Sequence, residues 1–583
     1  MNPVLGTIKT VLMRSYDGLP YHLKSCFLYM PIFPEDQRVG RGRLVRRWTA
    51  EGYSREVRGK SAKEIADSYF MELIGRSMIL PSEQSIHSTK GINFCQVHDL
   101  IREIGISKSM EENLVFTLEE GCSSNSQATM RHLAINGNWK GDQSEFNSIV
   151  NVSCVRSLTV FGQWKSFFIS DKMSLLRVLD LEDTTGVCHH HLKHIGKFIH
   201  LRYLSIRGCE RIFHLPDSVG NLMQLETLDI RDTGIVKLPK SIIKLRKLNY
   251  LRAGGEPTNE DVSYEEPEDF PQVMKNRPCL LCLLTVPSCL MCCAPQSLSD
   301  GSENRYDLCT TLCCYALPAV LMRLELSGVL VPRGISKLKT LHTLGVVNIG
   351  RRGKVILQDI KELTQLRKLA VTGVTKESGQ QLCSTIIGLT RMESLSIRSC
   401  GEPGLSACLD GKFSFPEKLQ SLKLYGSVVK LPEWIEGLKN LVKLKLRSSR
   451  ISEHHGAIRV LGNLPYLGFL HLLHKSFEGE EVRLNFRLES FPSLVLLQVD
   501  AVYNLNSVEF EQGATPKLEL LQFSGSSPKP NVGLFRGLPS LPSLKEFMLD
   551  DDKYEEDFMD DLRDQLAKNQ TGPILKRFSL KSY

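Results

Sequence analysis

A short phrase of leucines recurs through most of this chain and constrains its fold more than any other feature. The phrase is Leu, two residues, Leu, one residue and an aliphatic residue, as in LRYLSI from Leu201 and LVKLKL from Leu441. Counting weaker copies such as MRHLAI from Met130, it occurs roughly sixteen times up to Leu549, at intervals of about 20–27 residues. The second leucine and the aliphatic residue lie two positions apart, so they face the same side of a short strand.

One unit of this size cannot bury its apolar face alone, so the units must stack into a curved solenoid. The interval is that of leucine-rich repeats, in which the strands form a parallel sheet on the concave side. Several copies continue into a segment such as LPDSVGNL from Leu215 or LPEWIEGL from Leu431, which predicts a short helix or irregular turn on the convex side. We therefore predict the α/β fold of a leucine-rich-repeat solenoid, which offers a broad surface and no catalytic pocket.

A small hydroxyl or thiol side chain follows several of the predicted strands. We expect each to donate a hydrogen bond to backbone carbonyl groups in the turn between neighbouring repeats. These residues are Thr184, Cys209, Thr233, Cys400, Ser427 and Ser449.

Composition limits where such a chain can work. Its 583 residues carry a net charge of +8, which is mild over this length and gives no reason to expect nucleic acid as a partner. The N-terminus lacks the apolar core of a signal peptide, and the most apolar stretch, Cys279–Cys293, is too short to span a bilayer. With 17 cysteines and no secretion signal, we predict reduced thiols and a cytoplasmic location, with no transmembrane segment.

The repeats fall into two parts, residues 129–253 and residues 321–583, and the second part ends in an acidic cap. Between them, residues 254–320 form an irregular, cysteine-rich insertion. Cys279-x-x-Cys282 and Cys289-x-x-Cys292 have the spacing of zinc ligands, but leucine and methionine alternate with these cysteines, which favours burial as small apolar side chains. The histidine run 189–194 also lacks a cysteine or carboxylate to complete a ligand set, so we expect no metal site.

Residues 1–110 do not share the repeat. Apolar residues at helical spacing predict helices over Tyr21–Tyr29, over Gly42–Glu56 and after Ser61, followed by a hairpin near Gly91. A further helix opens at His98 and Asp99, where Asp99 is placed to cap it. Helices and a short hairpin make a small winged-helix domain, and residues 111–128 then serve as a linker into the solenoid.

Three segments of this domain resemble motifs of plant nucleotide-binding leucine-rich-repeat disease-resistance proteins of the coiled-coil type. SYDGLPYHLKSCFLYMPIFPED from Ser15 resembles the segment around their Cys-Phe-Leu-Tyr motif, and LVRRWTAEGY from Leu44 resembles their Trp-x-Ala-Glu-Gly continuation. QVHDLIREI from Gln96 is similar to their Met-His-Asp motif, with Val97 in the methionine position. Because the three motifs stand in the family's order and precede the repeats, the resemblance covers essentially the whole chain.

The resemblance implies that His98 senses the β-phosphate of ADP from the winged-helix side and that Asp99 orders the start of the helix. In that family, ADP or ATP is held by an ATPase module that precedes the winged helix. The sequence contains no G-x-x-x-x-G-K-[ST] phosphate-binding loop. We therefore expect this chain alone to bind no cofactor, and we interpret it as the C-terminal part of such a protein.

The resemblance implies part of an intracellular immune receptor: the solenoid recognises a pathogen effector, or a host protein that an effector modifies, and restrains signalling in the defence response. No Ser-His-Asp, Cys-His or paired-carboxylate arrangement stands out, so we do not expect an enzyme. Most of the exposed strand positions are basic, which predicts an acidic partner surface. The predicted ligand-facing residues are Arg202, Tyr203, Arg207, Arg367, Lys368, Arg398, Lys423, Lys443, Lys445 and Arg447.

Other interpretations stay open. The chain could be a degenerate fragment, or a decoy that docks onto full-length relatives through its winged helix. A ubiquitin-ligase adaptor is a third hypothesis, although the N-terminal domain does not resemble the short helical box of such adaptors. We interpret the basic run Arg38, Arg41, Arg43, Arg46 and Arg47 as a solvated helix face, with nucleic-acid binding as the alternative.

Overall fold

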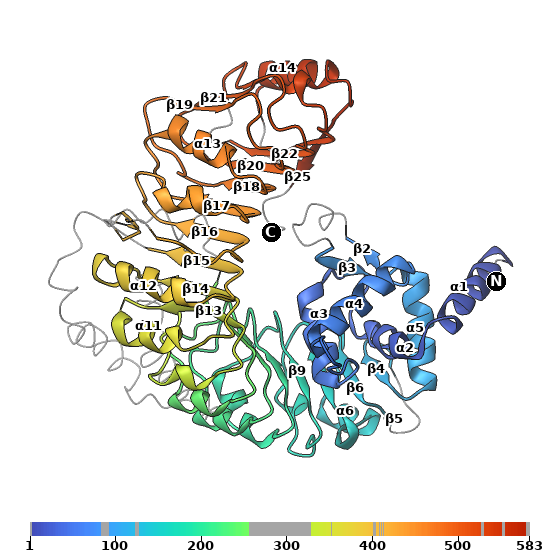
Figure 1. Cartoon of the computed structure of the whole chain (residues 1–583). Helices are drawn as coiled ribbons and strands as arrows, with labels where there is room; N and C mark the ends of the chain where they lie inside the picture. The colour runs from blue at the N-terminus through green and yellow to red at the C-terminus, as the bar shows by residue number, and fades with distance from the viewer. Residues whose placement is uncertain are drawn as a thin grey trace, which may run out of the picture.

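The computed structural model describes residues 3–82, 92–122, 128–255, 328–350, 352–399, 404–406, 408–409, 411, 413–525, 530–550 and 554–578. These residues form a curved solenoid with a helical domain at its N-terminal end (Figure 1). The helical domain lies on the inner side of the curve, next to the first repeats.

One parallel sheet of seventeen strands forms the body of the solenoid. Successive repeats pair in register, so that Leu204 lies opposite Leu228, and Leu422 opposite Leu444. Along the sheet the strands are β4 (Val115–Leu118), β6 (His132–Ile135), β8 (Ser157–Val160), β9 (Val178–Asp180), β10 (Tyr203–Ser205), β11 (Thr227–Ile230), β12 (Tyr250–Ala253), β13 (Thr343–Asn348), β14 (Lys368–Thr372), β15 (Ser394–Arg398), β16 (Ser421–Tyr425), β17 (Lys443–Arg447), β18 (Phe469–Leu472), β20 (Leu496–Asp500), β22 (Leu520–Ser524), β24 (Glu546–Asp550) and β25 (Ile574–Phe578).

The leucines of the repeated phrase build one continuous apolar core along the solenoid. Leu201 and Leu204 of one copy, and Leu441 and Leu444 of another, are each 0% exposed. Alternate residues of each strand therefore face the core, as the spacing predicts. The predicted solenoid with a curved parallel sheet is confirmed.

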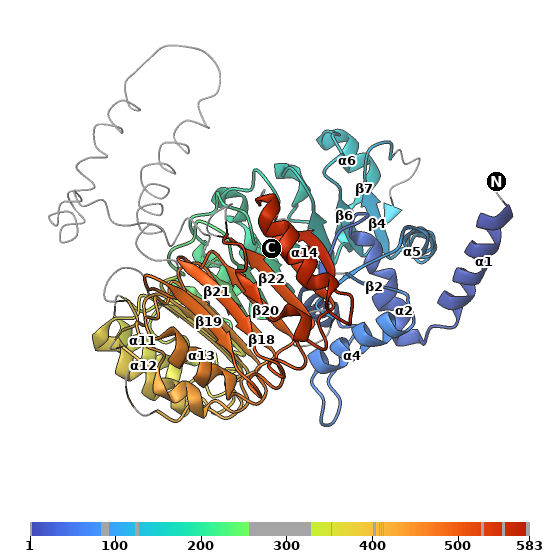
Figure 2. The same ribbon diagram turned by 90° about the horizontal axis from the view of Figure 1, so that it is seen from above.

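The convex side carries short helices and a second, smaller sheet. Figure 2 shows the last strands of the main sheet side by side, with the strands of the smaller sheet next to them. The 3-10 turns are η3 (Val152–Cys154), η4 (Ser166–Phe168), η5 (His189–Leu192), η6 (Ile195–Lys197), η7 (Asp217–Asn221), η8 (Lys240–Lys244), η11 (Ile335–Lys337), η12 (Glu433–Gly437) and η13 (Leu538–Ser540). The α-helices are α6 (Gln143–Ile149), α11 (Gly353–Lys361), α12 (Lys376–Gly388), α13 (His454–Gly462) and α14 (Glu556–Ala567), and the additional strands are β19 (Val482–Phe486), β21 (Leu505–Phe510), β23 (Phe535–Arg536), β5 (Ala128–Thr129) and β7 (Val150–Asn151).

Proline stands immediately before three of the 3-10 turns. Pro216, Pro239 and Pro432 are extended, and η7, η8 and η12 begin at the next residue. The fixed φ of proline and its missing N–H are tolerated where the chain enters a helix, because no intrahelical bond is lost there. The predicted LP segments are thus short convex turns.

Hydroxyl and thiol groups bridge neighbouring repeats, as predicted for the residues after the strands. Thr184 donates to the carbonyl of Val160 in the preceding repeat at 2.8 Å, and Cys209 donates to that of Leu181 at 3.1 Å. Thr233 instead bonds within its own turn, to the carbonyl of Ile230 at 2.8 Å. Ser449 also bonds locally, to the carbonyl of Arg447 at 3.5 Å, and Cys400 lies outside the described residues.

Replacing Thr184 by valine tests this bridge. The change keeps the shape of the side chain but leaves the buried carbonyl of Val160 without its donor, so we expect a loss of about 1–3 kcal/mol in the free energy of unfolding. The neighbouring Thr185→Val is a matched control, because the Thr185 hydroxyl bonds to Gly162 at an exposed position. Urea denaturation of both variants measures the difference, and equal losses would contradict the assignment.

The N-terminal domain has the predicted helices and wing. Its helices are α1 (Pro3–Asp17), α2 (Tyr21–Leu28), α3 (Arg41–Glu51), α4 (Ala62–Gly75) and α5 (Asp99–Glu111), with the 3-10 turn η1 (Met30–Ile32). The strands β1 (Val39–Gly40), β2 (Leu80–Pro81) and β3 (Phe94–Gln96) form a small antiparallel sheet in the order β1-β3-β2. A capping box between Ser61 and Glu64 starts α4, because each side chain bonds to the other residue's backbone N–H.

One domain boundary differs from the sequence prediction. The predicted linker 111–128 contains β4, which pairs along its whole length with β6 in the main sheet. The solenoid therefore begins earlier than predicted, at Val115. The apolar residues Val115 and Leu118 of β4 are buried, and this burial stabilises the strand although it lacks the full repeat phrase.

The predicted insertion 254–320 falls between neighbouring strands of the sheet. β12 pairs directly with β13, with Tyr250 opposite Thr343, so the sheet continues across a long stretch of sequence. Residues 256–327, including the Cys-x-x-Cys pairs at 279–282 and 289–292, lie outside the described residues.

Candidate functional site

The winged-helix domain docks on the concave face of the first repeats through α3. This helix contacts β9 and β10 (Figure 1). Ala50 of α3 packs with Val178 of β9 and Tyr203 of β10 in a small apolar cluster in which no residue is more than 1% exposed. The surface around this contact is the candidate regulatory site.

A buried ion pair lies at the centre of the interface. Oδ2 of Asp180, at the end of β9, is 2.6 Å from Nη1 of Arg47 and 2.8 Å from Nε of Arg43. Arg47 also donates to the Thr159 hydroxyl at 2.5 Å and to the Tyr29 hydroxyl at 3.0 Å. Burial would raise the pKa of Asp180, but the charges of Arg43 and Arg47 hold it below its ordinary value. The ion pair therefore stays charged at neutral pH.

A second buried contact lies at the C-terminal end of α3. Oε1 of Glu51 is 3.7 Å from Nδ1 of His132 in β6, and the Tyr53 hydroxyl is 2.6 Å from Nε2 of the same ring. Arg177 donates to the backbone carbonyl of Glu51 at 2.9 Å. Burial raises the pKa of Glu51 to about 7, although Arg177 and Arg47 oppose the shift. Burial and the charge of Arg47 lower the pKa of His132 well below its ordinary value, so this imidazole is neutral.

Glu51 should make the stability of the protein depend on pH. Between pH 4.5, its ordinary pKa, and about 7, the folded chain binds more protons at this carboxyl than the unfolded chain, so its contribution to stability falls as pH rises. Glu51→Gln removes the ionisation. Between pH 4.5 and pH 8, we expect the free energy of unfolding of the variant to rise by about 3 kcal/mol relative to that of the wild type.

Urea denaturation at a series of pH values measures this difference. Glu377→Gln on the exposed surface of α12 is the control, and it should show a nearly constant difference from wild type. A constant difference for Glu51→Gln as well would contradict the prediction.

Three of the predicted ligand-facing residues are buried, and the prediction is wrong for them. Tyr203 is 0% exposed because α3 covers it, and Arg398 and Arg447 are 5% and 7% exposed. Arg398 donates to the carbonyl of Gly255 at 2.6 Å and lies over the Tyr425 ring. The alternation of a strand places these side chains on the concave side, but neighbouring segments cover that side here.

Four other predicted residues lie outside this buried set, and three of them pair with carboxylates. Arg207 bridges Glu182 at 3.0 Å and Asp232 at 3.1 Å, so carboxylates already balance its charge. Arg202 lies 3.8 Å from Glu226, Arg367 lies 3.5 Å from Glu393, and Lys368 is exposed at the start of β14.

The remaining three predicted residues form a compact group, here called the lysine ladder: Lys423, Lys443 and Lys445. Lys423 of β16 lies directly opposite Lys445 of β17, and Lys443 is two residues before Lys445 on the same face. Lys445 in turn lies opposite His471 of β18. Burial, followed by the charges of Lys443 and Lys445, lowers the pKa of His471 well below its ordinary value. The ladder therefore concentrates positive charge on the concave face.

The residues predicted to sense nucleotide lie at the start of α5. His98, not Asp99, caps this helix: Nδ1 of His98 accepts a hydrogen bond from the Leu100 N–H at 3.3 Å, and Asp99 is the first helical residue. The predicted capping role of Asp99 is thus wrong, because the side chain one position earlier reaches the free N–H groups. Both side chains are exposed, and their role toward a nucleotide stays a prediction.

The basic run is not a solvated face. Arg43 and Arg47 are ion-paired with Asp180 inside the interface, Arg41 pairs with Asp67 at 2.8 Å, and Arg46 lies over the Tyr250 ring. Arg43, Arg46 and Arg47 thus contact the solenoid, and Arg41 pairs with α4, so the charge argument for nucleic acid does not apply to the arginines of α3. The sequence contains one signal for this docking: the two carboxylates Asp180 and Glu182 in the phrase LRVLDLED, which could balance the arginines of α3.

The described part of the chain offers neither a cluster of metal ligands nor a membrane-spanning helix. Among those residues, no three His, Cys, Asp or Glu side chains come together as a possible metal site. None of their helices is both long enough and apolar enough to cross a membrane.

Comparison with known proteins identifies both parts of the chain. The leucine-rich repeat region family matches residues 154–283 and 316–569, and the disease-resistance-protein winged-helix domain matches residues 32–104. The chain belongs to the leucine-rich-repeat proteins of the plant disease-resistance type. The residues that match the winged-helix domain of disease-resistance proteins include all of α3, the helix that docks on the solenoid, and the start of α5.

Its relatives are plant resistance proteins. Disease resistance protein Pik-2 of Oryza sativa subsp. japonica is 28% identical over 94% of this chain and 51% of its own length. Disease resistance protein RGA4 of the same plant is 29% identical over 88% of this chain and 44% of its own length. The resistance-type chain thus spans about half the length of these relatives. An LRR protein of Leptospira interrogans matches with a TM-score of 0.38 and 13% identity, covering 80% of this chain and 97% of that chain.

Proposed function

We propose that the chain is the recognition and restraint part of an intracellular plant immune receptor. The later repeats would bind an acidic surface of a pathogen effector or of a host protein that an effector modifies. The docked winged helix would hold the resting state. The supporting observation is the division of the concave face: α3 covers β9 and β10, whereas the lysine ladder lies on β16 and β17.

The charge of the ladder supports the choice of partner. Lysines held side by side on one face by strand pairing repel one another and favour a carboxylate-rich surface that approaches them. No catalytic step is part of this function, since binding and release account for it. In the complete receptor, a nucleotide would be held outside this chain, with His98 facing its β-phosphate.

Reversing the ladder charge tests the recognition role. We expect the triple variant Lys423→Glu, Lys443→Glu, Lys445→Glu to lose at least about tenfold of its capture of acidic partners, because each reversal adds repulsion as well as removing attraction. Tagged wild type and variant would be expressed in leaf tissue, and the captured proteins compared by quantitative mass spectrometry.

A matched control places the same charge change elsewhere. Lys354, Lys361 and Lys376 are exposed on α11 and α12, away from the ladder strands, and their change to glutamate should leave specific capture intact. Equal capture by wild type and the ladder variant would overturn the proposed role of this face.

The structure argues against one alternative. A decoy that docks onto relatives through its winged helix could not use the α3 face in this conformation. The described residues place that face against β9 and β10, with Arg47 0% exposed.

A further inference from the structure

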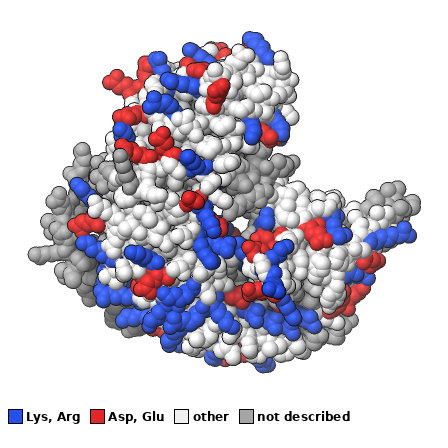
Figure 3. Space-filling model, viewed as in Figure 1, with Lys and Arg blue, Asp and Glu red and all other residues white. Residues whose placement is uncertain are grey.

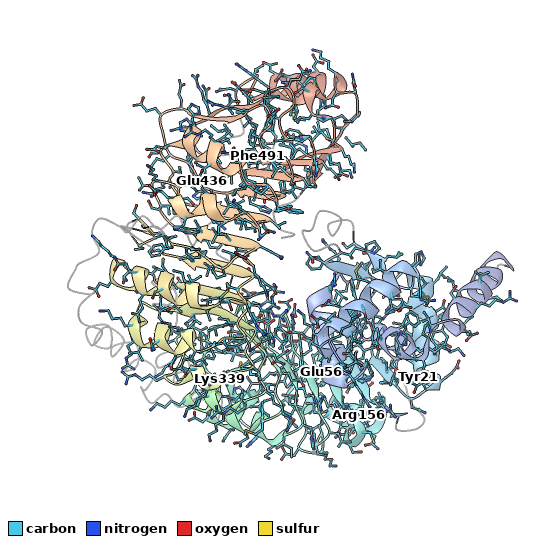
Figure 4. All side chains as sticks on the ribbon, viewed as in Figure 1. Tyr21, Glu56, Arg156, Lys339, Glu436 and Phe491 are labelled. Atoms are coloured by element: carbon cyan, nitrogen blue, oxygen red, sulfur yellow. The ribbon has the colours of Figure 1, made fainter. Side chains whose placement is uncertain are left out.

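A pocket of about 450 Å³ lies at the edge of the first repeats, outside the lysine ladder. Its lining residues are Arg156, Arg177, Arg202 and His200, the amides Asn221 and Gln224, and the apolar residues Leu175, Ile199 and Met223. Figure 3 shows lysine and arginine side chains gathered along the lower part of this face, where Figure 4 labels Arg156 and Lys339.

The three arginines occupy one position of the repeat. Each stands immediately before a strand, at β8, β9 and β10. These strands pair in register, and the N–H of Arg177 donates to the carbonyl of Arg156 at 2.6 Å, as that of Arg202 does to Arg177 at 2.8 Å. Their backbones are therefore stacked at the strand spacing of about 5 Å, which brings three guanidinium groups to one side of the pocket.

Carboxylates balance this positive charge only in part. The buried Glu51 interacts electrostatically with Arg156, Arg177 and Arg202, and Glu226 is the only carboxylate within ion-pair distance among the described residues, 3.8 Å from Arg202. Arg177 donates to a neutral backbone carbonyl, and the side chain of Arg156 makes no hydrogen bond or ion pair within the described chain. Burial, together with the neighbouring charges of Arg156 and Arg202, lowers the pKa of Arg177, as expected for like charges held together.

We propose that this pocket binds a compact anion that carries two or more phosphate groups. A guanidinium group offers parallel N–H donors that match phosphate oxygens, and three of them converge here. Asn221 and Gln224 add amide groups that can donate to further oxygens. A concave pocket suits a small free anion better than a flat lipid surface or a long nucleic-acid strand, because the arginines line a recess and not an extended track.

Calorimetric titration of the full chain with inorganic tripolyphosphate at low salt tests the proposal. We expect saturable binding that weakens about tenfold or more in Arg156→Gln and in Arg202→Gln, since each removes charge-assisted hydrogen bonds, and that disappears in the double variant. Arg177 is left unchanged because it also holds the end of α3. Arg459→Gln, on the exposed surface of α13, is the control and should bind as wild type does.

Thermal unfolding of each variant checks that the fold is kept. Absence of saturable binding to the wild type, or an unchanged affinity in the double variant, would overturn the proposal. A twenty-nucleotide single strand serves as competitor. The oligonucleotide could displace tripolyphosphate from the wild type and bind the double variant as tightly as it binds the wild type. The pocket would then be part of a general basic surface, and the proposal would fail.

Discussion

Replacing Asp180 by alanine is expected to lower the free energy of unfolding by about 3–5 kcal/mol, the cost of leaving a buried ion pair without one partner. Asp180 and Arg47 each have 0% of their side chains exposed, and Arg43 is only 11% exposed. The variant leaves the buried Arg47 without its carboxylate partner, whereas Arg43 keeps Glu182 at 3.1 Å. We expect the docked winged helix to be destabilised first, because these bonds join it to β9.

Hydrogen exchange locates this loss, and urea denaturation gives its size. Faster exchange should appear in α3 and β9 and not in the distant strands β22 and β24, because repeats contact only their neighbours. Asp171→Ala is the control: Asp171 also pairs with a cation, Lys197, but 66% of its side chain is exposed, so a much smaller loss is expected. Similar losses in both variants would show that the buried pair does not hold the interface.

Replacing Ala50 by arginine is expected to displace the winged helix from the solenoid. Ala50 is 1% exposed, and its methyl group packs on Val178 and Tyr203. An arginine there would bury an unpaired cation close to Arg46 and Arg47 on the same helix, at a cost of several kcal/mol. The cost disappears when α3 leaves the concave face, so the two parts should separate along α3, while η1 and α5 still pack on β4 and β6.

Limited proteolysis and small-angle scattering would detect the separation. We expect cleavage between residues 52 and 61 to become much faster and the radius of gyration to rise, with far-UV circular dichroism nearly unchanged. Ala567→Arg at the exposed end of α14 introduces the same side chain without burying it, and it should behave as wild type. An Ala50→Arg protein that stays compact and protease-resistant would contradict the proposed interface.

Such a released state bears on the proposed function. If docking restrains the receptor, both Asp180→Ala and Ala50→Arg should expose Tyr203 and the concave side of β9 and β10. The lysine ladder on β16 and β17 should remain intact in both variants, since it makes no part of the α3 contact. The proposed roles in recognition and restraint should therefore be separable by mutation.

The sequence by itself determined the solenoid. Periodic leucines require stacking, and the alternation within each strand assigns core and surface, because both follow from local geometry repeated along the chain. The same locality allowed Thr184 and Cys209 to be assigned as bridges between repeats, and the helices of the winged-helix domain to be placed.

Only the tertiary structure decided which surface remains available. Tyr203 and the arginines of α3 have the pattern of exposed residues, yet they are buried because two distant segments pack together. Lys443 of the lysine ladder and Tyr203 occupy equivalent repeat positions, and no local pattern separates them. The pocket of Arg156, Arg177 and Arg202 likewise arises from stacking three repeats in register, which brings together side chains more than twenty residues apart. Contacts between segments far apart in sequence carry no periodic signal, so docking, burial of charge and the division of the concave face required the folded chain.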